Sequence, residues 1–257
     1  MTFGSETWAT LGGSMHFNER AEDYDSARPS YPADLWTTLR EQGLLEPGLR
    51  ALDLGAGTGQ ATGPLVAAGL SVTAVEPGPR LAERLRARYP GVSVVADRAE
   101  DLGMPDASFD LVVAATAVHW FDLDVVLPKI SRLLAPGGRF AVWRNVFGDP
   151  TVTTPFRQRV GDIVRRRDPR QRRSPDPEDL DATVERLTRG GMFELVQTST
   201  YRWSVELSAE HVRRLFGTFS DWSEREAAQA GAAVEELGGS VVEHYQSWLI
   251  LLRPGKR

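Results

Sequence analysis

Short apolar runs alternate with amphipathic segments over the first two thirds of the chain. The runs have the length of strands, and several are apolar at nearly every position, as in a parallel sheet buried on both faces. We expect strands at residues 51–54, 71–75, 92–95, 109–115 and 139–143. We expect helices at residues 33–42, 60–68, 80–89 and 123–134. Strands that alternate with helices of about ten residues predict an α/β fold with a doubly wound sheet.

The rest of the chain departs from this alternation. Residues 145–190 contain Pro150, Pro155, Pro169, Pro175 and Pro177, which predict an irregular insert. Beyond the insert, strands are expected at 193–205 and 241–252, and helices at 209–216 and 224–237. The organisation predicted is a disordered tail at 1–14, a core with its N-terminal arm at 15–144, the insert, and completion of the sheet by 191–257.

Glycine alternates with small residues directly after the first expected strand. Gly55, Gly57 and Gly59 allow positive φ and carry no Cβ, so backbone amides there can approach a ligand closely. Asp53 comes from the end of the strand, and Ala56 and Gln60 belong to the same turn. The spacing G-x-G-x-G differs from the G-x-G-x-x-G of dinucleotide-binding proteins, which argues against a nicotinamide dehydrogenase.

An acidic residue, Glu76, ends the second expected strand, 21 positions after Gly55, and Pro77 follows it. Nucleotide-binding folds place a ribose-binding carboxylate about 20 residues after the first glycine. Together with the sequence Leu52-Asp-Leu-Gly-Ala-Gly-Thr-Gly59, this resembles the class I S-adenosylmethionine-dependent methyltransferases. The resemblance implies a Rossmann-like, seven-stranded, mostly parallel sheet whose last strand is antiparallel, with helices on both faces, an N-terminal arm and an inserted lid.

The segment before the core is similar to the arm of the trans-aconitate-methyltransferase-like subgroup, which includes small-molecule enzymes. It contains Tyr24-Asp-Ser-Ala-Arg28-Pro-Ser-Tyr31-Pro32. In that subgroup the arm folds over the cofactor, which implies that Tyr24 and Arg28 contact it. A guanidinium suits the methionine carboxylate, because it can bind a carboxylate through two parallel bonds. The alternative is a surface cap held by Tyr31 and Trp36.

Two loops after later strands supply the remaining cofactor candidates. After the third expected strand, Ala99 and Glu100 occupy the place where the family binds adenine. The alternative for each side chain is a solvated polar loop. After the fourth strand come Ala115 and Thr116, then His119 and Trp120. An aromatic face at Trp120 would suit a sulfonium cation.

His119 is expected to face the reacting methyl, because ligands in open α/β sheets lie beyond the carboxyl ends of the strands. A neutral imidazole there could act as a general base toward a hydroxyl, an amine or an acidic carbon. The alternative is that His119 only packs or positions the loop, since the same His-Trp pair recurs in the subgroup whatever the acceptor.

The methyl acceptor leaves a weaker signal. Its pocket is expected to include four aromatic residues, namely Phe17, Trp143, Phe219 and Trp222. The last two lie in residues 209–225, which are expected to join the insert as the lid. For Phe219 and Trp222 the alternative is ordinary core. The arginines within residues 165–173 favour a solvated face, and the alternative is recognition of an acidic acceptor.

Composition narrows the partners. The net charge is −5, from 30 basic and 35 acidic residues, so the balance does not indicate a nucleic acid partner. The absence of cysteine excludes disulfides and thiolate metal sites. Asp122 and Asp124 are too few to indicate a metal site. Without a signal peptide or an apolar run of about 18 residues, a cytoplasmic protein without a membrane span is expected, as a monomer or a homodimer.

The function predicted is methyl transfer from S-adenosylmethionine, which leaves S-adenosylhomocysteine, to a small-molecule acceptor by in-line displacement. Positioning of the two reactants would supply most of the catalysis. Two alternatives use the same fold: a protein that only binds adenosylmethionine, and a biosynthetic cyclase that has lost methyl transfer. The sequence distinguishes these poorly, because the cofactor motifs would persist in each.

Overall fold

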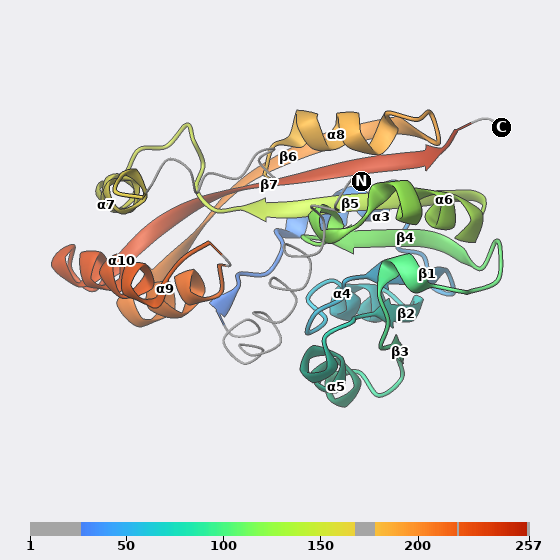
Figure 1. Cartoon of the computed structure of the whole chain (residues 1–257), viewed down its shortest axis with the longest axis horizontal. Coiled ribbons are helices and arrows are strands. Elements are labelled where there is room, and N and C mark those ends of the chain that lie inside the picture. Colours follow the sequence, from blue (N-terminus) through green and yellow to red (C-terminus); the bar gives the residue numbers. More distant parts are fainter. Residues whose placement is uncertain (1–26, 168–177, 220, 256–257) are drawn as a thin grey trace, which may run out of the picture. The chain divides into compact units, whose positions relative to one another are not determined.

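The computed structural model describes residues 27–167, 178–219 and 221–255 (Figure 1). They form two compact units, each described by itself. Described residues of unit 1 fall within 1–30, 146–174 and 202–246, and those of unit 2 within 31–145, 175–201 and 247–257. Phe17, Tyr24 and the expected tail lie outside the described residues. The insert predicted at 145–190 contributes residues to both units.

The strands form one seven-stranded sheet in the order β3-β2-β1-β4-β5-β7-β6. Their bounds are β1 Arg50–Leu54, β2 Ser71–Val75, β3 Ser93–Val95, β4 Phe109–Ala115, β5 Leu134–Val146, β6 Phe193–Ser208 and β7 Ser240–Pro254. The pairs β2–β3, β1–β2, β1–β4 and β4–β5 are parallel. The β7 arrow points opposite to those of β4 and β5 in Figure 1. The predicted fold class, mostly parallel with an antiparallel last strand, is therefore confirmed.

The helices cover both faces of this sheet or form most of unit 1. Their bounds are α3 Ala33–Glu41, α4 Thr62–Ala67, α5 Pro79–Arg88, α6 Leu123–Leu133, α7 Pro155–Arg165, α8 Leu180–Thr188, α9 Ala209–Gly217 and α10 Glu224–Glu236. Two short 3₁₀ helices, η1 Ala99–Asp101 and η2 Val118–Trp120, follow β3 and β4. The strand order reverses between β1 and β4, and a ligand crevice lies beyond the strand ends at such a reversal.

Two predicted boundaries were wrong in an informative way. Helix α4 begins at Thr62 and not at Gln60, because the glycine turn continues through Ala61. Strand β5 begins at Leu134, which pairs with Phe109, and resumes at Arg139, which pairs with Leu111. The residues between them bulge out of the register, with Gly137 at φ 84°. The Pro-Gly-Gly turn therefore lies inside the strand and not before it.

The core of unit 2 follows the alternation of the strands. On one face Ala51, Val72 and Leu111 pack with Leu35 of α3 and Leu65 of α4. Residues of opposite parity, such as Leu52, Val112 and Phe140, are also fully buried. The sheet is thus covered on both faces, as its apolar strands require. Burial on both faces fixes the register and so the positions of the strand ends.

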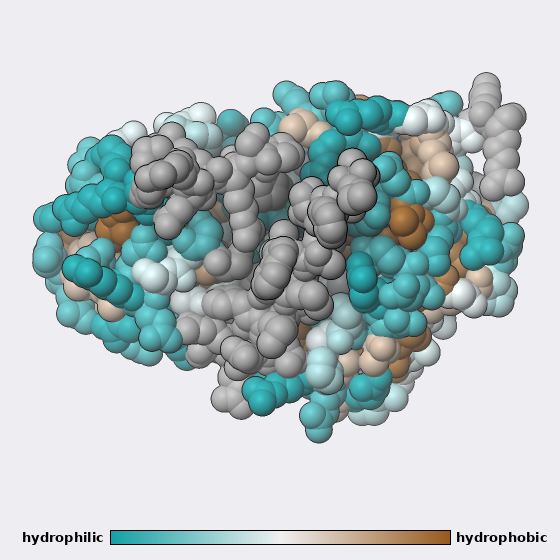
Figure 2. Space-filling view, in the orientation of Figure 1, coloured by the Kyte–Doolittle hydropathy of each residue, from teal (hydrophilic) through white to brown (hydrophobic). Residues whose placement is uncertain are grey.

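The core of unit 1 is made by three helices and the aromatic residues around them. Phe156 of α7, Phe216 of α9 and Val234 of α10 belong to one buried cluster. Ser223 begins α10 with a capping box that includes Glu226. In the part of the chain that the structure describes, no helix is long and apolar enough to cross a membrane. Figure 2 shows mainly hydrophilic residues over the described surface of the face in view.

Candidate functional site

Asp53 stands at the end of β1 and is fully buried. Its Oδ2 accepts a 2.6 Å hydrogen bond from the Thr62 hydroxyl at the start of α4, while Oδ1 has no hydrogen-bond partner among the described residues. Burial raises the pKa of the Asp53 carboxyl to about 7, and the bond from Thr62 offsets part of that rise. A buried carboxylate oxygen without a partner is costly, so a ligand that donates to it would be bound favourably.

The glycine loop has the positive φ angles that the sequence predicted, and it is also closely packed. Gly55, Gly57 and Gly59 all have positive φ, at 71°, 59° and 96°. A Cβ at Gly55 would lie 2.6 Å from the Cβ of Ala117. A Cβ at Gly59 would lie 2.6 Å from the side chains of Leu85 in α5 and of Tyr89, which caps the end of that helix. Glycine is therefore required at these two positions both for the backbone conformation and for the space.

Glu76 follows β2, and its carboxylate holds the loop. Oε2 accepts from the Gly57 amide at 2.9 Å and Oε1 from the Gly78 amide at 2.8 Å. The residue is 5% exposed, and this burial raises the pKa of its carboxyl, with the two amide bonds offsetting part of the rise. Each carboxylate oxygen has a second lone pair, so Glu76 remains able to accept hydrogen bonds from two ribose hydroxyls.

The expected adenine loop is η1. Ala99 is buried there, and Glu100 connects the loop to the start of α6. Oε1 of Glu100 accepts a 2.9 Å bond from the Asp122 amide, and Oε2 lies 3.4 Å from Arg98 Nε. The side chain of Glu100 thus has a structural task. Ala56, in the glycine loop, is buried, whereas Pro77 is exposed. Their cofactor contacts, and that of Gln60, stay predictions.

The exit of β4 carries an unusual backbone. Thr116, the residue after Ala115, has φ 54°, which is rare for a β-branched residue. Its amide donates to the Trp143 carbonyl at 2.8 Å, and its hydroxyl lies 3.0 Å from the Tyr31 hydroxyl. Strained backbone of this kind is concentrated at functional sites. The hypothesis that the chain leaving β4 meets the ligand is consistent with it.

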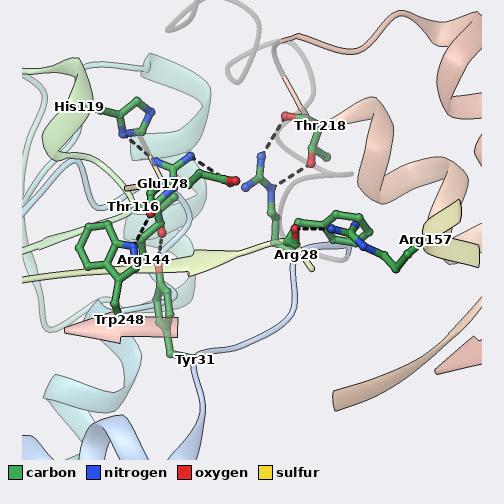
Figure 3. A network of polar contacts seen from close by, with 10 residues as sticks. Arg28, Tyr31, Thr116, His119, Arg144, Arg157, Glu178, Thr218 and Trp248 are labelled. Atoms are coloured by element: carbon green, nitrogen blue, oxygen red, sulfur yellow. Dashed lines mark hydrogen bonds and ion pairs between the residues drawn. The ribbon is translucent and has the colours of Figure 1, made fainter. Parts of the chain in front are cut away.

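His119 and Trp120 lie in η2, directly after this strained residue, with ring centroids 4.6 Å apart. Nδ1 of His119 lies 3.0 Å from Nη1 of Arg144, near the end of β5. The Arg144 guanidinium in turn lies 3.7 Å from Oε1 of Glu178. Figure 3 shows Arg144 between the two residues. Neither Arg144 nor Glu178 was predicted as a site residue. Arg144 directly follows an expected strand, which was a usable signal, whereas Glu178 had none.

Trp143, a predicted acceptor-pocket residue, is fully buried in the core of unit 2. Its ring makes edge-to-face contacts with Tyr31 at 5.8 Å and with Trp36 at 5.5 Å between centroids. Trp143 is thus surrounded by core side chains, although its indole N–H has no hydrogen-bond partner among the described residues. The pocket role stays a prediction.

In unit 1, Arg28 donates to Thr218, from Nε to the hydroxyl at 3.0 Å and from Nη2 to the carbonyl at 3.1 Å. Its guanidinium carbon lies 4.7 Å from the centroid of the Phe219 ring. Phe219 and Trp222 both pack against the core cluster of this unit. The Arg28 bond to a cofactor carboxylate and the pocket roles of the two aromatics stay predictions.

The arginine run at 165–173 is described only as far as Arg167. There the Arg167 side chain pairs with Glu226 at 2.8 Å and with Asp221 at 3.1 Å. Its guanidinium carbon also lies 4.6 Å from the centroid of the Trp222 ring. Arg165, by contrast, is 68% exposed and pairs within its own helix with Asp162. Within the described residues, no group of three or more His, Asp or Glu is placed to hold a metal ion.

Comparison with known proteins identifies relatives of this chain. Residues 52–142 match the family model described as "Methyltransferase domain". An uncharacterized methyltransferase of Mycobacterium tuberculosis is 34% identical over 197 residues, which cover 77% of this chain and 73% of that protein. An uncharacterized methyltransferase-like protein of Schizosaccharomyces pombe is 28% identical, over 88% of this chain and 86% of its own length.

Solved structures give the same fold. One assigned as a type II methyltransferase from Anaeromyxobacter dehalogenans has a TM-score of 0.61 at 28% identity, and the match covers 89% of this chain and 97% of that one. The [4+2]-cyclase SpnF has a TM-score of 0.57 at 17% identity, covering 96% and 97% of the two chains. The second likeness concerns the fold alone.

Proposed function

Because the chain belongs to the methyltransferase family, with S-adenosylmethionine as its cofactor, we propose that it methylates a small-molecule acceptor by in-line displacement. The observation that carries the proposal is the pair of buried acids around the glycine loop. Glu76 holds the loop through the Gly57 amide, and Asp53 keeps one carboxylate oxygen without a partner. Both carboxylates can accept hydrogen bonds that an adenosyl ligand would donate from its amino group and its two ribose hydroxyls.

The residues present fit that cofactor. Glu76 would accept from the ribose hydroxyls, and Asp53 stands at the loop expected to hold the amino-acid end. At Gly55 an added Cβ would lie 2.6 Å from the Cβ of Ala117, so there is no space for a side chain at this position. Ala99 and Glu100 would line the adenine, and Arg28 would bind the carboxylate. The bound cofactor supplies an electrophilic methyl group on a sulfonium.

The chain's own contribution to catalysis is to hold the acceptor in line with that methyl group. Positioning two reactants about 3–3.5 Å apart in the right orientation removes several kcal/mol from a barrier. The loop from Thr116 to Trp120 would do this, because it leaves the sheet at the strand reversal. The Trp120 ring would stabilise the sulfonium charge by about 0.5–2 kcal/mol. His119 is the candidate for direct contact with the acceptor.

A small molecule is favoured as the acceptor because the chain is acidic, with a net charge of −5, which disfavours nucleic acids. Membership of the trans-aconitate-methyltransferase-like subgroup and a monomeric or homodimeric state belong to the same proposal. So does a lid role for residues 145–190 with 209–225. The alternative of a cyclase on the same fold has the SpnF likeness in its favour, at the level of the fold.

Methyl transfer is tested with S-adenosylmethionine labelled at the methyl group and a library of acids, phenols, amines and thiols. We expect label in an acceptor from one of these classes, together with S-adenosylhomocysteine as the second product. Tight binding of the cofactor without labelled product across the library would favour the cyclase or the binding protein. Tight binding of NADH without S-adenosylhomocysteine binding would contradict the whole proposal.

A further inference from the structure

The contact between His119 and Arg144 determines which imidazole nitrogen carries the proton. A guanidinium has only donors and stays charged at any ordinary pH. Nδ1 of His119, 3.0 Å from Arg144 Nη1, must therefore accept that hydrogen bond. An imidazolium could not do so, because both of its nitrogens carry protons. The bond consequently selects the neutral imidazole with its proton on Nε2.

Arg144 is itself fixed in place within unit 2. Its side chain is 13% exposed, and Oε1 of Glu178 lies 3.7 Å from its Nη2. The indole of Trp248 on β7 donates to the Glu178 carbonyl at 2.9 Å, which anchors that residue just before α8 (Figure 3). A partly buried guanidinium with a carboxylate on one side and an imidazole on the other has little freedom to turn. The proton on His119 is therefore directed by a chain of contacts that reaches from β7 to η2.

We propose that Arg144 is a positioning residue that holds His119 in the Nε2–H form, so that His119 presents the acceptor with a hydrogen-bond donor and not with a base. A neutral imidazole has one lone pair suited to take a proton, and here that lone pair, on Nδ1, receives the Arg144 hydrogen bond. This inference rests on the proposed function, because it assumes that an acceptor approaches η2.

The acceptor class follows from the donor. A donor at Nε2 is complementary to an oxygen that carries a lone pair or a negative charge. An oxygen that is already ionised needs no base, because forming the oxygen–methyl bond as the sulfur–methyl bond breaks leaves no proton to remove. We therefore assign to this site an acceptor with an anionic oxygen next to His119, in preference to a protonated amine.

The test is nitrogen NMR of the full chain labelled with ¹⁵N-histidine, with and without S-adenosylhomocysteine. The spectrum of the His119→Gln variant identifies the His119 signals among those of the four histidines. At pH 7.5 we expect wild-type His119 to carry its proton on Nε2 and none on Nδ1. A protonated Nδ1, or a doubly protonated ring, would overturn the proposal without recourse to any variant.

Three arginine variants separate positioning from a general structural effect. Arg144→Met should reduce the preference for the Nε2–H form by about tenfold or more, because a hydrogen bond from a charged donor is lost. Arg144→Lys should keep the preference, since an ammonium also donates. Arg139→Met is the control on the same strand, where the Arg139 side chain donates to the carbonyls of Gly137 and Gly138. An unchanged tautomer in Arg144→Met would overturn the proposal.

The proposed function and the inference about His119 can be contradicted separately. If S-adenosylhomocysteine does not bind the wild-type chain, the proposed function fails, whatever form His119 takes. If it binds and His119 carries its proton on Nδ1, only the present inference fails. Transfer of label to amines alone would overturn the assigned acceptor class and leave the methyltransferase intact.

Discussion

Glu76 in unit 2 and Glu243 in unit 1 are both buried, at 5% and 0% exposure, but their carboxylates are satisfied in opposite ways. Both oxygens of Glu76 accept hydrogen bonds from backbone amides. Neither oxygen of Glu243 has a hydrogen bond of standard geometry among the described residues, and Arg157 Nε lies 3.6 Å from Oε1. Arg157 and the backbone amide of His244 only partly offset the effect of burial on this carboxyl. Burial raises the pKa of both carboxyls, that of Glu243 to about 7.

The difference shows how each acid came to be buried. Glu76 accepts from Gly57 and Gly78, both of which belong to the turns that follow β1 and β2. Glu243 instead lies on β7 and meets Arg157 of α7, 86 positions earlier in the chain, which stacks 4.6 Å from the Phe147 ring. Its surroundings exist only once unit 1 has assembled. Glu76 is therefore held by the turns next to it in the sequence, whereas the surroundings of Glu243 are made by tertiary packing.

The largest effect on stability is expected at Gly59, because the glycine loop that Glu76 holds has no space there for a side chain. Gly59→Ala should destabilise the fold by about 4 kcal/mol, because the new Cβ meets the side chains of Leu85 and Tyr89 at a positive φ. Gly91→Ala is the matched control, with nothing within 4 Å of its Cβ. Chemical denaturation of both variants measures the difference. Equal stabilities would show that the loop is not constrained as described.

Glu243→Gln tests the other carboxylate through the pH dependence of stability. Its folded pKa is raised to about 7, so the folded state holds the proton more tightly than the unfolded state. Stability from this group is therefore full below its usual pKa, about 4.5, and is lost as pH rises through 7. The loss amounts to roughly 3 kcal/mol at about 1.4 kcal/mol per pKa unit.

The measurement is the difference in unfolding free energy between wild type and Glu243→Gln from pH 4.5 to 8. We expect the variant to gain on the wild type across this window, while the exposed control Glu46→Gln does not. Asp53 and Glu76 also have raised pKa values, but both proteins contain them. Their contributions therefore cancel in the difference between wild type and variant. If the unfolding free energies of wild type and Glu243→Gln changed in parallel with pH, the raised pKa of Glu243 would be contradicted.

Arg157→Met should sharpen the same contrast. Without the guanidinium the ionised Glu243 has no counter-charge among its described contacts, so we expect a loss of about 2 kcal/mol at pH 8. At pH 5 Glu243 is protonated, and the loss should be smaller. Denaturation at the two pH values, repeated in the Arg157→Met, Glu243→Gln double variant, measures the coupling. A loss independent of pH would mean that Arg157 acts only through packing.

The smallest effects are expected in the arginine run. Arg167→Met should cost about 1–2 kcal/mol, since it loses a partly buried ion pair with Glu226, an exposed one with Asp221 and the contact with the Trp222 ring. Arg165→Met, at an exposed pair, should cost less than about 0.5 kcal/mol. Thermal unfolding compares them. If Arg165→Met instead raised the acceptor KM without changing stability, the interpretation of this residue as a solvated surface group would be wrong.

The same contrast explains what the sequence could predict. Strand positions, the sheet class and the glycine loop were predictable, because apolar runs and positive-φ glycines are local signals. The exact start of β5 was not, since Leu134 pairs with Phe109 across a bulge that no local pattern indicates. Glu178 and Glu243 were missed because their partners come from distant segments, whereas Arg144 could have been selected because it directly follows an expected strand. Arg28 was noticed for its motif, but its bonds to Thr218 depend on a helix 190 positions away.

The most direct test of the central claim is calorimetric titration of S-adenosylhomocysteine into the wild-type chain, Glu76→Ala and the exposed control Glu83→Ala. We expect micromolar binding to wild type and to the control, which is about −8 kcal/mol. Glu76→Ala should bind about 100-fold more weakly, because it loses the ribose contacts and the loop bond to Gly57. No binding to wild type, or equal binding to Glu76→Ala, would contradict the account.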